Sequence, residues 1–324
     1  MALDDGDLTT ILDLIFSHRM DWVQGFLKDH GLKVSGKKDE LRTRLESSID
    51  KGKIEEEKLV LRLDRIEGWG NQHIYLYKVG EALIARLSSE QKVKKALEKQ
   101  DCENLLNQPT PLVLPDEPTL SVVEWDQHHI RFVWIEKRTW RQPVPEEDRH
   151  EDDLEFDAYR PMISRGIVSF NCDLVSARAE LMIQRLPSGA NYAEEKRRFE
   201  EELGNFIDVA ELTVVAIGKA IKTIDKSPDV RKRSTQFALP NGPSVTFNSG
   251  SKKKDAYSDP KVKKSRLALG KDVAGRLGNF YWPTDDGREI HVKLYAKDQR
   301  VGIFGECNEQ EVRDVLSGVR RFGK

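Results

Sequence analysis

The sequence contains few cysteines, and they lie far apart. Cys102, Cys172 and Cys307 are the three cysteines among 324 residues, and no pair has CxxC spacing. This distribution argues against a disulfide framework and against a zinc finger, and it is typical of a reducing compartment. We therefore expect an intracellular protein, located in the nucleus of a eukaryote or in the cytoplasm and nucleoid of a prokaryote.

Long apolar runs and a strong net charge are also lacking. No apolar stretch approaches the roughly 20 residues needed to cross a bilayer, and the first residues are acidic, unlike those of a signal peptide. The formal net charge is −2, although charged residues make up 33% of the chain. We expect no membrane association, and any affinity for nucleic acid must come from local patches of cations.

Motifs for catalysis are scarce as well. The sequence has no GxxxxGK loop, and no GxGxxG follows a predicted strand, so P-loop nucleotide hydrolysis is not expected. One group near the C-terminus resembles the carboxylate clusters of metal nucleases, but its spacing matches no nuclease motif. It comprises Asp285, Asp286, Glu289, His291 and Lys293. We expect a non-enzymatic protein without metal or cofactor, and we keep a metal-dependent nuclease subunit as an alternative.

The clearest pattern lies between Met20 and Lys51. Apolar residues recur at helical spacing in its first part, and Gly31 should end that helix, since glycine adopts a left-handed conformation without a steric clash. Residues 32–34 then read as extended, and Ser35 occupies the expected N-cap of a second helix. The buried stripe of that second helix comprises Leu41, Leu45 and Ile49.

This succession of helix, extended loop and helix resembles the SAP motif, a small DNA-binding module of chromatin and DNA-repair proteins. The matching residues are His30-Gly31-Leu32, Val34-Ser35-Gly36-Lys37-Lys38, Glu40-Leu41 and Arg44-Leu45, about a tenth of the chain. The resemblance implies that the N-terminus of the second helix lies against the backbone of duplex DNA. It also implies weak sequence preference.

The residues at this helix start are suited to phosphate. The N–H groups and the positive dipole end of a helix N-terminus bind anions, and Gly36 allows a close approach. The candidate DNA contacts are Lys33, Ser35, Gly36, Lys37, Lys38, Arg42 and Arg44. Acidic residues are interleaved with these cations, so a single module should bind weakly. The alternative is a helical hairpin that contacts protein.

A second basic feature lies near the C-terminus. Between Lys226 and Lys271, twelve Lys and Arg residues face three Asp residues. Residues 248–265 are rich in Ser, Lys and Gly and are predicted to form a mobile loop that follows a nucleic-acid backbone. The candidate contacts are Lys252, Lys253, Lys254, Lys263, Lys264 and Arg266. A solubilising linker is the alternative.

Changes in composition and hydrophobic period divide the chain. Four prolines fall within residues 107–118, and after them the period changes from helical to alternating. We predict a multidomain α+β protein in which an all-α SAP-like domain precedes two antiparallel sheet-plus-helix units. The predicted divisions are a DNA-binding domain (1–54), a helical extension (55–106), a proline-rich linker (107–118), an α+β unit (119–225), a basic flexible segment (226–271) and a second α+β unit (272–324) whose sheet includes 231–248.

These patterns together predict a modular protein of chromatin or the nucleoid. Its partner would be double-stranded DNA, held through the phosphate backbone by the helical domain and the basic loop. The α+β body would associate with a partner protein or a second copy. Tyr281 and Trp282 are expected to pack within the sheet rather than stack on bases. A protein-interaction scaffold in a chromosome-associated or defence complex is the main alternative.

Overall fold

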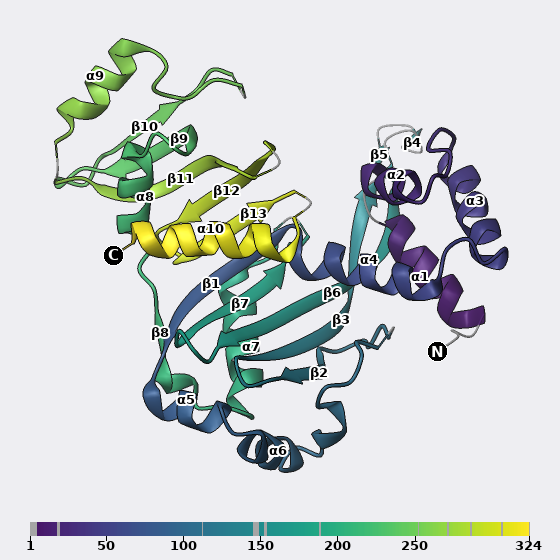
Figure 1. Ribbon diagram of the computed structural model, residues 1–324. Helices are drawn as coiled ribbons and strands as arrows, with labels where there is room; N and C mark the ends of the chain where they lie inside the picture. The colour runs from purple at the N-terminus through teal and green to yellow at the C-terminus, as the bar shows by residue number, and fades with distance from the viewer. Residues whose placement is uncertain are drawn as a thin grey trace.

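The computed structural model is an α+β protein, as the sequence predicts (Figure 1). It describes residues 5–17, 20–111, 113–144, 149–151, 154–187, 189–251, 253–270, 272–285, 287–305 and 307–323. Within these ranges there are ten α-helices, an antiparallel sheet of eleven strands, and a separate hairpin of β4 (Arg149–Glu151) and β5 (Leu154–Phe156). Among the helices in these ranges, none has the length and apolar character required to span a membrane.

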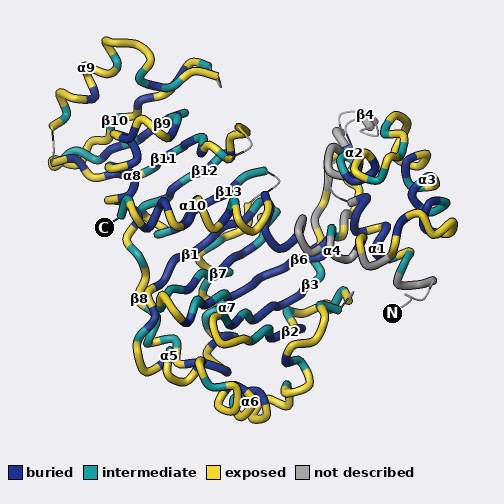
Figure 2. The backbone as a smooth tube through the Cα atoms, in the orientation of Figure 1, coloured by how far each residue is buried: buried dark blue, intermediate teal, exposed yellow. Residues whose placement is uncertain are grey.

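Four helices at the N-terminus share one apolar core. They are α1 (Asp5–Ser17), α2 (Met20–Asp29), α3 (Lys38–Asp50) and α4 (Glu56–Trp69). Each contributes a fully buried side chain, respectively Ile11, Leu27, Leu45 and Leu63. A two-helix hairpin buries too little apolar surface to be stable alone. Helices α1 and α4 supply the remainder, and Figure 2 shows the buried interior of this group.

The eleven strands form one continuous sheet, whereas the sequence suggested two units. The strands are β1 (Gln72–Val79), β2 (Thr119–Trp125), β3 (His129–Pro143), β6 (Tyr159–Asp173), β7 (Arg178–Gln184), β8 (Leu212–Val214), β9 (Arg231–Ala238), β10 (Ser244–Asn248), β11 (Ala274–Pro283), β12 (Glu289–Tyr295) and β13 (Arg300–Phe304). Their order is β10-β9-β11-β12-β13-β1-β7-β6-β3-β2, and β8 also pairs with β1. The strands of residues 119–184 therefore join those of residues 231–304 through β1.

Strand β1 was not predicted from the sequence. The predicted helical extension (55–106) includes these residues, but α4 ends at Trp69 and a strand begins at Gln72. Only Gly70 and Asn71 separate the two elements, and Asn71 adopts a left-handed conformation with φ of 52°. Seven of the eight strand residues are buried because both faces are covered. A strand covered on both faces has no polar alternation to reveal it.

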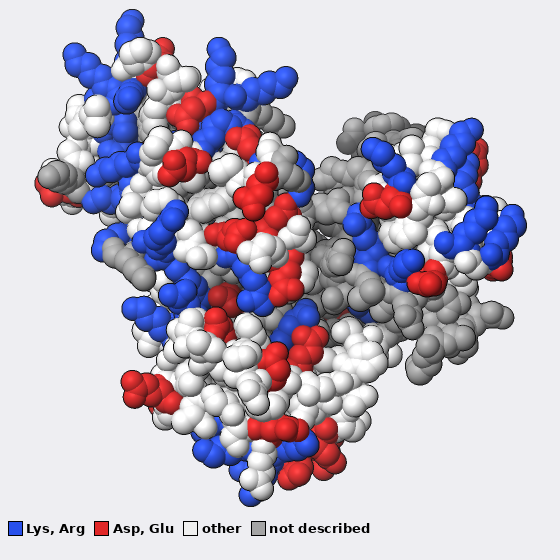
Figure 3. All heavy atoms as spheres, in the orientation of Figure 1, with Lys and Arg blue, Asp and Glu red and all other residues white. Residues whose placement is uncertain are grey.

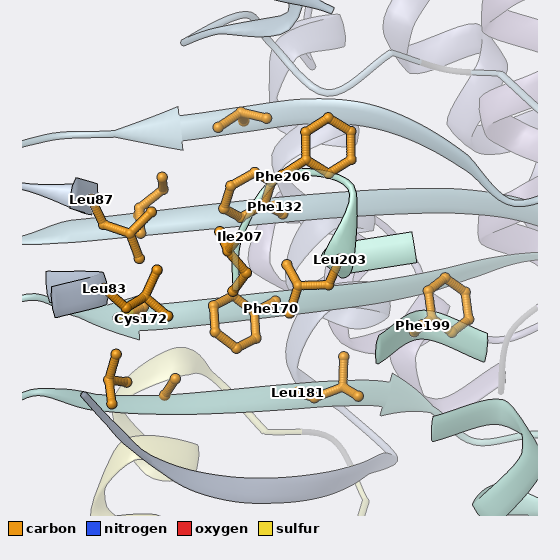
Figure 4. Close-up of a cluster of buried hydrophobic side chains, with 14 of the residues drawn as sticks. Leu83, Leu87, Phe132, Phe170, Cys172, Leu181, Phe199, Leu203, Phe206 and Ile207 are labelled. Atoms are coloured by element: carbon orange, nitrogen blue, oxygen red, sulfur yellow. The ribbon is translucent and has the colours of Figure 1, made fainter. Parts of the chain in front are cut away.

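Helices cover both faces of the sheet around β1. Alternate residues of β1 point to opposite sides, so Tyr75 and Tyr77 join one core and Ile74 and Leu76 the other. The first core lies under α5 (Glu81–Leu87), α6 (Glu90–Glu98) and α7 (Tyr192–Gly204). Figure 4 shows its aromatic centre, which includes Phe132 and Phe170. The second lies under α8 (Gly218–Lys226) and α10 (Glu309–Phe322).

The region expected to be a helical extension is interrupted. Residues 80–106 contain the two short helices α5 and α6 and a single 3-10 turn at Glu103–Leu105, separated by Ser88-Ser89 and by Asp101 at φ 52°. The described residues of the proline-rich segment after them form no helix before β2, and the segment is attached to the sheet. The carbonyl of Pro115 accepts from the backbone N–H of Lys137 at 2.7 Å. This segment therefore lies along the body of the protein.

One buried ion pair connects the helices to the sheet. The Arg165 guanidinium, on β6, donates from Nε to Glu67 Oε2 of α4 at 2.8 Å, and both side chains are at most 2% exposed. Arg165 also donates to the carbonyl oxygen of Pro111 at 3.0 Å. Charges removed from water are costly unless each is paired, so the two groups depend on each other. This pair fixes α4 against the sheet.

We expect Glu67→Ala to destabilise the fold by about 3–5 kcal/mol, because it leaves the Arg165 charge buried without its partner. Glu90→Ala provides the control, since the exposed pair between Glu90 and Lys94 should contribute at most about 1 kcal/mol. Urea unfolding followed by tryptophan fluorescence measures both. Equal midpoints for the two variants would contradict a structural role for the buried pair.

Candidate nucleic-acid interface

Helix α2 ends where the sequence indicates. Gly31 has φ of 68°, and the backbone N–H of Leu32 donates to the carbonyl oxygen of Leu27 at 2.8 Å. This is the hydrogen-bond pattern of a Schellman cap, which requires a left-handed residue at this point. The chain then turns away from the helix axis. Leu32 and Val34 pack against the core of the four helices, which fixes the path of the extended loop.

The second helix begins three residues after the predicted cap. Ser35 was expected at the N-cap and this is wrong, because Gly36 has φ of 136° and Lys37 is still extended with φ of −71° and ψ of 163°. Helix α3 therefore begins at Lys38, and Lys37 occupies the N-cap. Lysine has no oxygen with which to accept from the first turn. The positive end of this helix thus lacks the side-chain cap that Ser35 would have supplied.

Two of the predicted phosphate contacts hold the hairpin together. Arg44 donates from Nη1 to the carbonyl oxygens of Lys33 and Ser35, at 2.5 and 3.1 Å, and so attaches the loop to α3. Arg42 forms ion pairs with Asp13 of α1 and with Glu46, the latter at 2.9 Å. The hydrogen bond to Asp13 raises the pKa of Arg42. Arg44 therefore positions the loop, and Arg42 connects α3 to α1.

The remaining candidates of the hairpin are exposed. Lys33, Ser35, Gly36, Lys37 and Lys38 all lie at the surface. No ion pair involves these three lysines within the part of the chain that the structure describes. Their charges are therefore available to a ligand, and the loop that carries them is held from below by Arg44.

A carboxylate competes for the same helix end. Glu40 Oε2 accepts from the backbone N–H of Lys37 at 3.4 Å. A Cβ atom at position 36 would lie 2.5 Å from the same oxygen, so Gly36 leaves room for this carboxylate. Asp39 is exposed beside it. A phosphate at the helix start must therefore displace Glu40, which weakens the anion site.

The second basic region is folded, whereas it was predicted to be a mobile loop. Residues 260–268 form helix α9 (Pro260–Ala268), capped by Asp259, which accepts from the N–H of Lys261 at 2.7 Å. The segment before it is attached to β9: the N–H of Ala256 donates to the carbonyl oxygen of Lys232 at 2.8 Å. Tyr257 packs against Phe247 of β10. These contacts fix the segment that leads into α9.

The lysines of this region are exposed, but its arginine is not. Lys253, Lys254, Lys263 and Lys264 lie at the surface, and Lys252 lies outside the described residues. Arg266 is 7% exposed, with Nε 2.6 Å from Asp225 Oδ2 and Cζ 4.1 Å from the centroid of the Phe237 ring. Arg266 therefore anchors α9 to α8 and β9 and does not face a ligand.

The residues considered for a metal nuclease do not converge. Glu289 pairs with Arg231, which lowers the pKa of Glu289, and His291 Nε2 lies 2.5 Å from Asn279 Oδ1. Asp285 is exposed on the turn before β12, and Asp286 lies outside the described residues. Within the described ranges no three His, Cys, Asp or Glu side chains are grouped as a metal site requires.

A groove that no sequence pattern indicated runs between α10 and the sheet. It has a volume of about 610 Å³ and is lined from five separate segments of the chain, among them by Trp69, Arg131, Asn171, Arg178 and Arg313. Its lining contains both acidic and basic side chains, and Figure 3 shows the two kinds intermixed below the position of α10. Such a mixed lining gives no net attraction for a polyanion.

A scan against protein-family models and a search of curated proteins found no match for this chain.

The position of the cap leads to a stability prediction. We expect Ser35→Ala to change the free energy of unfolding by less than about 0.5 kcal/mol, since Ser35 is exposed and is not at the cap. Gly36→Ala should cost about 1–3 kcal/mol because alanine disfavours a positive φ and meets Glu40. Thermal unfolding of the two variants tests this. A cost near 1 kcal/mol for Ser35→Ala would instead indicate a capping serine.

Proposed function

We propose that the protein binds duplex DNA through the loop and the first turn of α3. The observation that carries the proposal is the exposed run of Gly36, Lys37 and Lys38 at a helix start without an oxygen-bearing cap residue. The N–H groups of such a turn attract phosphate, and adjacent lysines add charge. The likeness of residues 20–51 to a SAP motif supports the same ligand. The four N-terminal helices would then be the DNA-binding unit.

The ligand contacts would be confined to the DNA backbone. Three exposed lysines, at positions 33, 37 and 38, surround the helix start. They do not form a row along one face of a helix that could enter a DNA groove. Contacts to phosphate position a protein without reading base edges. We therefore propose low sequence preference and a steep dependence on salt.

A second contact would come from the surface of α9 and the segment before it. Figure 3 shows Lys and Arg side chains gathered over the α3 end of the molecule and over the α9 end, both visible from one side. The exposed lysines of the α9 end are Lys253, Lys254, Lys261, Lys263 and Lys264. Two weak sites in one folded chain raise the apparent affinity through effective concentration. The sheet between them would act as a spacer and as a surface for protein partners.

The two lysines at the helix start provide the direct test. We expect the double variant Lys37→Gln/Lys38→Gln to bind a mixed-sequence duplex about tenfold or more weaker. Its plot of log K against log [salt] should lose about 1.8 of its slope, since each phosphate contact contributes about 0.9. Fluorescence anisotropy over a series of salt concentrations measures both quantities.

The matched control is Lys95→Gln/Lys99→Gln, which removes the same charge from exposed positions at the end of α6. If this control weakens binding as much as Lys37→Gln/Lys38→Gln does, then attraction is non-local and the α3 site is not the contact. If Lys37→Gln/Lys38→Gln still shows a salt dependence, adding Lys263→Gln/Lys264→Gln to it should lower the remaining slope of log K against log [salt].

The carboxylate at the helix start gives a prediction of opposite sign. We expect Glu40→Gln to tighten duplex binding roughly two- to fivefold, because a negative charge that occupies the anion site is removed and such interactions contribute about 0.3–1 kcal/mol. Asp50→Asn removes the same charge at the far end of α3 and should have a smaller effect. The same anisotropy titration compares them. Equal effects would contradict competition at the helix start.

A further inference from the structure

One half of the large sheet carries helices on a single face. Helices α8 and α10 pack on the side that presents Phe280, Val292 and Ile303. On the other side α7 covers β1, where Tyr75 Oη donates to the carbonyl oxygen of Tyr192 at 3.0 Å. Beyond β1, α7 reaches this second face at Arg300 of β13, through its first residue Tyr192. The described helices that pack on β11 and β9, α8 and α9, lie on the first side. We refer to this surface as the open face.

A row of rings crosses the open face. Tyr281, His291 and Phe304 are direct cross-strand neighbours on β11, β12 and β13. Their ring centroids are 5.3 and 5.2 Å apart, with interplanar angles of 30° and 34°. The guanidinium of Arg231, on β9, lies 3.9 Å from the centroid of Tyr281 and extends the row. All four residues are partly exposed, so Tyr281 does not pack in the core as Trp282 does.

A second row beside the first contains hydrogen-bond donors without acceptors. The guanidinium carbon of Arg300 lies 4.3 Å from the ring centroids of both Tyr192 and Tyr295. The Arg300 side chain is 9% exposed, and its Nε and Nη1 have no hydrogen-bond partner in the described structure. Nδ1 of the adjacent His73 is also unpaired. Buried polar groups are normally satisfied, so the Arg300 donors require acceptors that the described chain does not supply, and water or a ligand can provide them.

The open face is electropositive. Burial, together with the nearby charges of Arg300, Arg185 and Lys293, lowers the pKa of His73 to about 3. Asp298 pairs with Arg300 at 3.3 Å. Within the described chain no ion pair involves Lys293, which lies 5.3 Å from the centroid of the Phe304 ring. Glu289 pairs with Arg231, so the two acids Glu289 and Asp298 stand against the four cations Arg185, Arg231, Lys293 and Arg300. The opposite face of the same strands is apolar.

We propose that the open face binds single-stranded nucleic acid. Unpaired bases stack on aromatic rings, and Arg and Lys beside the rings hold the phosphates, as in proteins that bind single strands. A duplex would present its phosphates but not the faces of its bases to a sheet. An acidic peptide would satisfy the cations and leave the row of rings unused. The proposal does not depend on the duplex site at α3, which lies at another end of the molecule.

The test is anisotropy of a labelled oligothymidylate of about 16 nucleotides, which is within the range that one sheet surface covers. Tyr281→Ala and Phe304→Ala should each weaken binding roughly fivefold to a hundredfold, the range for loss of one stacked base. Lys293→Gln and Arg185→Gln should reduce the salt slope by about 0.7 each, the value for single strands. Tyr159→Ala is the matched control, because Tyr159 is 49% exposed on β6.

The glutamine variants guard against a folding artefact, since both change partly or fully exposed side chains whose charges pair with no described acid. Lys37→Gln/Lys38→Gln should leave oligothymidylate binding unchanged, so failure of the duplex proposal and failure of this one are distinguishable. The proposal is overturned if the oligonucleotide does not bind, or if Lys293→Gln binds as the native protein does. Equal competition by polyglutamate would assign the face to acidic peptides instead.

Discussion

Strand β1 is the element on which the arrangement of the whole molecule depends. Its backbone pairs with β7 on one side and with β13 on the other, so it joins two groups of strands into one sheet. Helix α4 precedes it by two residues, and the buried pair of Glu67 and Arg165 fixes that helix to β6. The N-terminal helices are therefore attached to the sheet through a continuous chain of buried contacts. Their exposed loop is carried on a rigid support.

The same principle operates within the hairpin. The backbone carbonyls of Lys33 and Ser35 are held by Arg44, and Arg42 connects α3 to α1. Side chains that are engaged in this way cannot also neutralise phosphate freely, which leaves three lysines for the ligand. Glu40 opposes them at the helix start. Three lysine charges opposed by one carboxylate favour a weak, salt-sensitive contact whose affinity increases with a second site. This agrees with the net charge of −2.

The sequence predicts those parts of the structure that local patterns determine. The end of α2 at Gly31 and the burial of Leu41 and Leu45 follow from spacing and from the conformation of glycine. Strand β1 lacks such a signal because both of its faces are buried. The burial of Arg266 depends on Asp225, which lies 41 residues away in the chain. The rings of the open face lie on one side of β12 and its neighbouring strands. The alternation of residues along a strand predicts which side chains share a face, but it does not predict whether a helix covers that face.

The most direct test of the central claim is hydrogen exchange of the native protein with and without a short mixed-sequence duplex. If the start of α3 holds phosphate, amides of residues 36–41 should be protected on addition of the duplex at low salt, and the protection should fade as salt is raised. Amides of α6 should not change. Saturating duplex binding without protection of residues 36–41 would contradict the account, because the exposed helix start would then have no part in holding DNA.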